Sequence, residues 1–118
     1  GTVMLDLDGD GDERTGWVIL YLHVAEEGRV KLGDVVKKGD NIGHPSCEGG
    51  RSTGTHLHIA RKYNGQWIPA ASSVLPFVMN GWVPVDGTNA YEGTLVKGNQ
   101  VVRASVFSDS QSLIPAQQ

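Results

Sequence analysis

The alternation of apolar and polar positions predicts short β-strands joined by turns. Residues 2–8 place apolar and polar side chains alternately, which is typical of a strand with one face in a core. Residues 17–25, with the sequence WVILYLHVA, are apolar on both faces, as in a central strand. Because the intervening GDGDERTG is a turn sequence, the two segments are expected to form a hairpin with a long acidic loop.

Glycines divide the middle of the chain into short pieces. In residues 30–43, VKLGDVVKKGDNIG, two extended pieces are separated by expected turns at Gly33-Asp34 and Gly39-Asp40. Residues 55–63, THLHIARKY, form a predicted strand. Asn64-Gly65 favours a type I′ turn because both residues tolerate positive φ angles, and QWIPA is then the returning strand.

The C-terminal part of the chain follows the same pattern. Residues 77–85, FVMNGWVPV, are predicted to form a strand broken at Asn80-Gly81, and residues 92–107 a hairpin that turns at Gly98-Asn99. The tail, residues 108–118, is polar and is expected to be loosely held. Since no segment has the periodicity of an amphipathic helix, the predicted fold class is all-β, a mostly antiparallel sheet of short strands and hairpins.

Composition narrows the class of protein only slightly. The 118 residues are 39% hydrophobic and 19% charged, as expected for a single globular domain spanning residues 1–118. A formal net charge of −3 without a basic cluster argues against nucleic-acid binding, and no apolar run is long enough to cross a bilayer. The sequence begins at Gly1 and shows no signal peptide, and the lone Cys47 rules out an internal disulfide.

Three histidines are the candidate functional residues. His56 and His58 are two apart in a predicted strand, so their side chains are expected on one face, with Leu57 and Ile59 opposite them in the core. If the two histidine-bearing strands are neighbours, His23 can join them, and three neutral imidazoles are a plausible zinc site. The plainer interpretation is that His56 and His58 are polar residues of the surface.

Three segments in close order carry a resemblance to a known family. GWVILYLHV, VKLGDVVKKGDNIG and GGRSTGTHLHIA resemble the Y-x-H strand, the glycine-punctuated segment and the S-T-G-x-H-L-H motif of the M23 metallopeptidases, the lysostaphin and LytM-type zinc endopeptidases. The resemblance covers roughly residues 16–60, which are similar to the C-terminal part of the catalytic domain of that family.

The resemblance implies a fold, an activity and roles for particular residues. It implies a mostly antiparallel β-fold that binds one zinc ion and cuts peptide bonds of bacterial peptidoglycan, outside the cytoplasm, in the cell envelope or the extracellular space. Zinc polarises the scissile carbonyl and lowers the pKa of a bound water, and a nearby imidazole can accept its proton. By position in the motifs, the metal ligand is His58, the catalytic residues are His23 and His56, and the substrate-binding residues are Tyr21, Thr53 and Thr55.

One part of the family pattern is missing. The family has two further zinc ligands in an H-x-x-x-D segment before the Y-x-H strand, but no histidine precedes His23, and Thr55 replaces the usual proline. The chain is then a piece of a longer peptidase, a degenerate module without hydrolytic activity, or a protein whose three histidines bind metal by themselves. A sheet without its opening strands exposes an edge, so a partner chain, a dimer contact or a covering loop is expected there.

The predicted function is therefore that of a zinc-dependent endopeptidase-like domain acting on peptidoglycan peptides, incomplete or inactive as an isolated chain. The alternatives are a non-catalytic module that binds cell-wall glycan or peptide, and a three-histidine metal protein of different activity. Two weaker features remain. Asp6, Asp8 and Asp10 resemble the start of a calcium loop with Gly11 at its turn, although Trp17 stands where the bidentate Glu belongs, so a solvated acidic turn is favoured. The role of Cys47, near His44, stays open.

Overall fold

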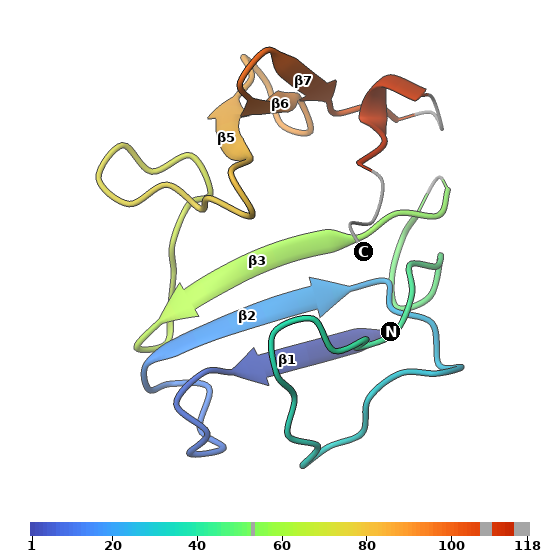
Figure 1. The fold of residues 1–118 in the computed structure, drawn as a ribbon, viewed down its shortest axis with the longest axis vertical. Helices are drawn as coiled ribbons and strands as arrows, with labels where there is room; N and C mark the ends of the chain where they lie inside the picture. The colour runs from blue at the N-terminus through green and yellow to red at the C-terminus, as the bar shows by residue number, and fades with distance from the viewer. Residues whose placement is uncertain (53, 107–109, 115–118) are drawn as a thin grey trace. The chain divides into compact units, whose positions relative to one another are not determined.

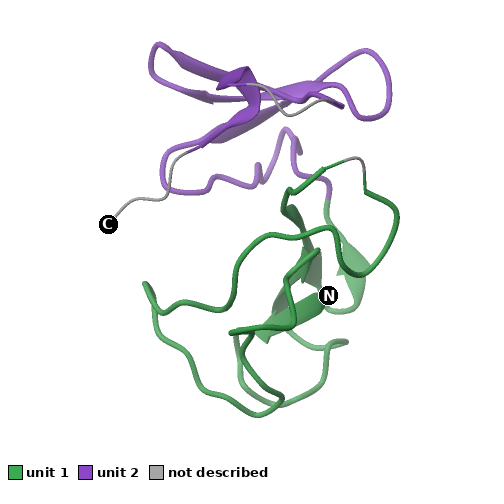
Figure 2. Cartoon of the chain, turned by 90° about the vertical axis from the view of Figure 1, so that its right-hand side faces the viewer, with its two compact units in different colours: residues 1–68 green, residues 69–118 purple. Residues whose placement is uncertain are grey.

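The structure is a computed structural model that describes residues 1–52, 54–106 and 110–114. Contacts divide the chain into two compact units, Gly1–Ile68 and Pro69–Gln118, coloured separately in Figure 2. Each unit carries one antiparallel sheet. The all-β prediction is confirmed, and the only helical element in the described ranges is the 3-10 helix η1, Ser110–Ser112. A compact unit is not by itself an independent domain, so the single domain stays a prediction, as does the loosely held tail.

The first unit is built on a four-stranded sheet in the order β1-β2-β3-β4. Its three longer strands, β1 to β3, lie side by side in Figure 1. Every neighbouring pair is antiparallel. The strand bounds are β1 Thr2–Asp6, β2 Trp17–Leu22, β3 His58–Tyr63 and β4 Gln66–Trp67. The expected hairpin with a long acidic loop is therefore present as β1 and β2. The outer strands of the sheet are β1 and β4, so a partner covering an edge stays a prediction.

The register assigns each strand residue to a face of this sheet. Thr2, Leu22 and His58 are opposite one another, and Val3, Tyr21 and Ile59 form the next row. Since opposite residues share a face and successive residues alternate, these two rows lie on opposite faces. The best-buried apolar side chain of the sheet is Val18, which is 1% exposed.

β2 is shorter than the apolar run predicts. The predicted strand continues to residue 25, but β2 ends at Leu22, so that boundary is wrong. The reason is local: His23 has a φ angle of 65°, in the left-handed region, which ends the regular pleat. Beyond it, Val24 pairs with Pro45 as an isolated bridge, and the amide of Ala25 donates to the carbonyl of His44 at 2.9 Å.

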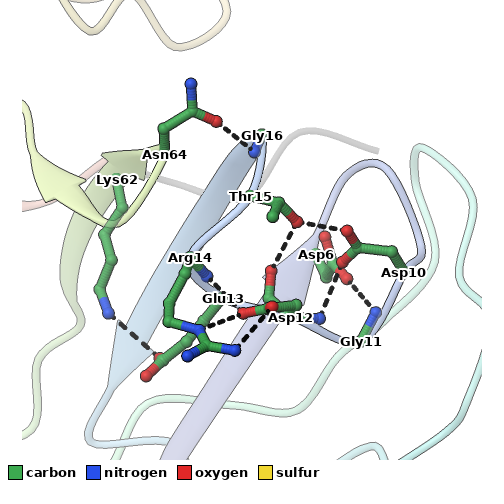
Figure 3. Close-up of polar contacts among 10 residues, drawn as sticks. All are labelled: Asp6, Asp10, Gly11, Asp12, Glu13, Arg14, Thr15, Gly16, Lys62 and Asn64. Carbon is green, nitrogen blue, oxygen red and sulfur yellow. Dashed lines mark hydrogen bonds and ion pairs between the residues drawn. The ribbon is translucent and has the colours of Figure 1, made fainter.

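The turn between β3 and β4 is the predicted one. Asn64 and Gly65 have φ angles of 47° and 78°, as a type I′ turn requires. Asn64 is also bound to Gly16, at the start of β2: its amide donates to the carbonyl of Gly16 at 3.0 Å, and its Oδ1 accepts from the amide of Gly16 at 2.8 Å (Figure 3). The returning strand is only two residues long, Gln66–Trp67.

The glycine-punctuated segment forms two similar turns outside the sheet. Asp34 donates its amide to the carbonyl of Lys31, and Asp40 donates to that of Lys37, both at 3.0 Å. Each aspartate also accepts at Oδ2 from the amide of the same lysine, at 2.8 and 2.7 Å. The turns predicted at Gly33-Asp34 and Gly39-Asp40 are therefore confirmed, and each is closed by its aspartate.

The second unit carries a three-stranded antiparallel sheet in the order β5-β6-β7. Its strands are β5 Val83–Asp86, β6 Gly93–Lys97 and β7 Gln100–Arg103. The predicted turn at Gly98-Asn99 is confirmed, because Lys97 and Gln100 pair on either side of it. At Asn80-Gly81 the chain reverses sharply, with Met79 and Trp82 paired across the turn. Among the described helices, none is long and apolar enough to span a membrane.

Candidate functional site

His23 is a buried histidine held by main-chain groups of the loop that contains Ser46 and Glu48. His23 is only 5% exposed. Its ring Nδ1 lies 2.9 Å from the carbonyl oxygen of Glu48. Its own carbonyl accepts two hydrogen bonds from Ser46, one from the amide at 2.6 Å and one from the hydroxyl at 2.9 Å. The backbone and the ring of His23 are therefore both fixed by one loop.

His56 precedes β3 and is exposed to solvent. Its ring Nδ1 lies 2.8 Å from the carbonyl oxygen of Gly54 and 3.2 Å from the hydroxyl of Ser52. That hydroxyl donates in turn to the same carbonyl at 2.6 Å. The main chain of His56 forms an isolated antiparallel bridge with Ser46.

The two histidines form a pair. The ring centroids of His23 and His56 are 4.4 Å apart, with the planes inclined at 50°. A carbonyl oxygen can only accept a hydrogen bond, so the Nδ1 of each neutral ring must carry the proton. The Nε2 of each ring then has a free lone pair. Such a nitrogen can accept a proton from a bound water or group, or bind a metal ion.

His58 is the first residue of β3 and is exposed. It lies opposite Leu22, on the face away from Tyr21. β3 begins after Leu57, so the pleat that would place His56 and His58 on one face does not extend to His56. Leu57 is 40% exposed, and the prediction that it lies in the core is wrong for the same reason.

The structure brings His23 and His56 together but does not complete a three-histidine cluster. Within the described part of the chain, one group of three or more potential metal ligands has all its ligand atoms within 4.8 Å of one another, and it consists of Asp6, Asp8 and Asp10. A structural zinc site takes four protein ligands and a catalytic one takes three. The described residues therefore do not supply a complete zinc site around His58.

The acidic loop between β1 and β2 is ordered by its own carboxylates (Figure 3). Asp6 Oδ2 accepts the amide of Gly11 at 2.7 Å, and Asp10 accepts the amide of Asp12 at 2.8 Å. The Thr15 hydroxyl also donates to Asp10. Glu13 pairs with Lys62 of β3 at 3.1 Å, which ties the loop to the sheet. A solvated acidic turn stays the favoured interpretation, and calcium binding at Asp6–Asp10 stays the weaker alternative.

Three carboxyl groups of this loop have shifted pKa values: hydrogen bonds, first that of the Thr15 hydroxyl, lower the pKa of Asp10, and the pKa values of Asp12 and Asp8 are shifted in opposite directions. The side-chain hydrogen bond from the Arg14 guanidinium, followed by the bond from its amide, lowers the pKa of Asp12 to about 2. The pKa of Asp8 is raised: the backbone hydrogen bond from Asp10 lowers it, but desolvation and the neighbouring carboxylates of Asp6 and Asp10 together outweigh that bond. Asp8 therefore binds a proton at a higher pH than Asp12 does.

The structure describes two of the three predicted substrate-binding residues, Tyr21 and Thr55. Tyr21 lies within β2 on the face opposite His58, and burial raises the pKa of its phenol. Thr55 is exposed and immediately precedes His56. Thr53 lies outside the described residues. Substrate binding by these three side chains stays a prediction, as do the roles of the histidines. Cys47 is an exposed free thiol.

Sequence reasoning missed the residues that hold the pair. Ser46 and Glu48 fix His23, and Ser52 and Gly54 fix His56. The signal for Ser52 and Gly54 was present in the S-T-G-x-H motif, since a serine followed by glycine is typical of a tight turn. The contacts of Ser46 and Glu48 bridge more than 20 residues of sequence, and no local pattern predicts them.

Fold and site together define an all-β protein that gathers a histidine pair where loops meet the ends of two sheet strands. Comparison with protein families matches residues 10–70, more than half of the chain, to Peptidase family M23. The chain therefore belongs to peptidase family M23. No curated protein and no solved structure matches it at the significance required.

Membership places the chain in a family of peptidases that are typically zinc-dependent and act on the peptidoglycan of the cell wall. The matched region begins before β2 and ends after β4, so it includes all three candidate histidines and most of the first sheet.

Proposed function

We propose that this chain carries the paired-imidazole part of a zinc-dependent endopeptidase site that cleaves peptide bonds of bacterial peptidoglycan, in the cell envelope or outside the cell. His23 and His56 act as the catalytic imidazoles, and His58 is a ligand of the metal. The observation that carries the proposal is the contact between the rings of His23 and His56, within a chain that belongs to family M23.

The hydrogen bonds of the pair suit hydrolysis. Each ring uses Nδ1 on a carbonyl oxygen and presents Nε2 as a base. One imidazole can then remove a proton from an attacking water while the other, once protonated, donates a hydrogen bond to the developing oxyanion. The burial of His23 fixes its orientation, and the exposure of His56 leaves room for a peptide.

The metal site is the incomplete part of the proposed active site. By the family pattern this chain offers one zinc ligand, His58, and the described residues do not complete the set. When bound, zinc supplies polarisation of the scissile carbonyl and a more acidic water. An isolated chain with this ligand set is expected to hold zinc weakly, which favours low activity for the chain by itself.

The second candidate is a non-catalytic module that binds peptidoglycan glycan or peptide through the same surface. The incomplete ligand set favours it, because a protein that only binds has no need of the metal. The three-histidine metal protein gains no such support, since His23, His56 and His58 do not gather within one ion's reach.

Metal content and hydrolysis decide between these functions. Zinc bound by the purified protein is measured by equilibrium dialysis at known free zinc concentrations, and the protein is then assayed at saturating zinc on insoluble peptidoglycan for release of soluble peptides, with and without a chelator. The variants are His56→Ala and His58→Ala. His44→Ala is the matched control, because His44 is an exposed histidine outside the pair.

A peptidase releases peptides, and loses that activity with the chelator, with His56→Ala and with His58→Ala, but not with His44→Ala. His58→Ala in addition reduces the zinc retained, whereas His56→Ala does not. Binding to peptidoglycan that survives the chelator, without hydrolysis by the unmodified chain at saturating zinc, contradicts the peptidase proposal and establishes the binding module.

A further inference from the structure

Ser46 lies between the two histidines and contacts both. Its amide and its hydroxyl donate to the carbonyl of His23, at 2.6 and 2.9 Å. On its other side, its main chain pairs with that of His56 in an antiparallel bridge. Because the preceding residue, Pro45, forms a bridge with Val24, the short segment around Ser46 lies alongside both histidine-bearing segments.

The hydroxyl of Ser46 also holds the group that orients the ring of His23. Ser46 Oγ accepts the amide of Glu48 at 3.0 Å, and the carbonyl of Glu48 in turn receives Nδ1 of His23 at 2.9 Å. The Glu48 carboxylate accepts the amide of Glu26 at 2.9 Å, which attaches the same loop to the segment that follows β2. The hydroxyl therefore closes a ring of contacts that begins at the carbonyl of His23 and ends at its imidazole.

This ring of contacts stabilises an unusual backbone conformation at His23. A histidine with a φ of 65° is in a region that L-residues rarely adopt, so the surrounding contacts must hold it there. The two bonds from Ser46 to the His23 carbonyl do so. The carbonyl of Glu48 then restricts the ring to one tautomer, with the proton on Nδ1 and the lone pair on Nε2, beside the ring of His56.

We propose that Ser46 is a positioning residue for the histidine pair, which acts by fixing the backbone of His23 and, through the carbonyl of Glu48, its tautomer. The value of this role to catalysis rests on the proposed function, in which His23 is a catalytic imidazole. The positioning itself is a property of the folded protein and can be tested without any substrate.

The test combines spectroscopy with activity. Long-range ¹H–¹⁵N NMR spectra of the unmodified protein, taken above the range where imidazoles protonate, distinguish a ring nitrogen that carries a proton from one that does not. They should show His23 as a single tautomer, protonated at Nδ1. In Ser46→Ala, the Nδ1 and Nε2 signals of His23 should move toward averaged positions, while those of His44 stay unchanged.

Ser46→Thr keeps a hydroxyl and should restore the single tautomer. Ser72→Ala is the matched control, because the hydroxyl of Ser72 also accepts a backbone amide, that of Leu75, in a turn of the second unit. It should leave the signals of His23 unchanged. If the proposed hydrolysis is detected, Ser46→Ala should lower kcat by about 10–100-fold, as loss of an orienting partner does, with little change in KM.

The outcomes separate the two proposals. An unmodified protein whose His23 is protonated at Nε2, or is an even mixture of tautomers, overturns the positioning role even if Ser46→Ala does not fold. A folded Ser46→Ala with the original His23 signals overturns it too. If no hydrolysis is found but the spectra change as described, the positioning of the pair is supported and the peptidase proposal alone fails.

Discussion

Replacing Asn64 by alanine tests what stabilises the turn between β3, the strand that carries His58, and β4. Asn64 has a φ of 47° and accepts the amide of Gly16 through its side chain. Alanine in the left-handed region costs about 1–2 kcal/mol, and a lost hydrogen bond costs about 1 kcal/mol. Allowing for the exposure of Asn64, Asn64→Ala should destabilise the first unit by about 2 kcal/mol, which is roughly 1 M in the urea midpoint.

Three further variants divide this effect into its causes. Asn64→Gly tolerates the φ angle but has no side-chain acceptor, so it should cost about 1 kcal/mol. Asn64→Asp keeps both properties and should cost less than either. Asn99→Ala is the matched control: Asn99 also lies in a hairpin turn, but its φ is not positive, so the change should stay within about 0.5 kcal/mol.

Stability is measured by urea unfolding, followed through the NMR peak intensities of backbone amides. Amides in β2 and β3 report on the first unit, for the Asn64 variants. Amides in β6 and β7 report on the second unit, for Asn99→Ala. The order of stability should be wild type, Asp, Gly, Ala. If Asn64→Gly is as unstable as Asn64→Ala, backbone conformation is not the cause. If Asn64→Ala matches the wild type, neither cause operates and the account of this turn is refuted.

Two further predictions concern the core and the acidic loop. Val18→Ala should destabilise the first unit by about 2–3 kcal/mol in the same urea assay, because Val18 is 1% exposed. Val101 is 46% exposed, so Val101→Ala should change the stability of the second unit by less than about 0.5 kcal/mol. Equal effects would contradict the burial argument. The pKa of the Asp12 carboxyl should be about 2 in a ¹³C NMR titration and should move toward 3.8, the ordinary value of an aspartate, in Arg14→Gln. Since the folded pKa is depressed, the contribution of Asp12 to stability is present above about pH 4 and is lost as the pH falls toward 2. An unchanged titration in the variant would rule out the guanidinium as the cause.

Local rules predict the turns of this protein well. The Asn64-Gly65 turn follows from the φ angles that its two residues tolerate. The turns at Gly33-Asp34 and Gly39-Asp40 follow from the same cause, with an aspartate that closes each on its own lysine. In each case the residues that set the turn conformation are within three positions of one another, so the sequence pattern predicts the turn, although the bond of Asn64 to Gly16 adds a distant contact.

The same rules fail where distant segments meet. The apolar run after Trp17 predicts a strand through residue 25, because alternation carries no sign of the left-handed residue at His23. That residue is held by the loop around Ser46, which is 23 positions away. Leu57 is predicted to lie in the core for a similar reason, since the pleat was extended past the start of β3.

The failure at His23 explains how the histidine pair forms. Had β2 continued in regular pleat, His23 would share the face of Tyr21, on the side away from His58. The left-handed φ of His23 removes it from that alternation and leaves its ring against His56, which itself precedes the regular part of β3. The pair thus depends on both histidines lying just outside their strands, and on loop contacts that hold each ring by Nδ1. We therefore expect that a substitution that continued the regular pleat of β2 through His23 would lengthen the strand but separate the rings of His23 and His56.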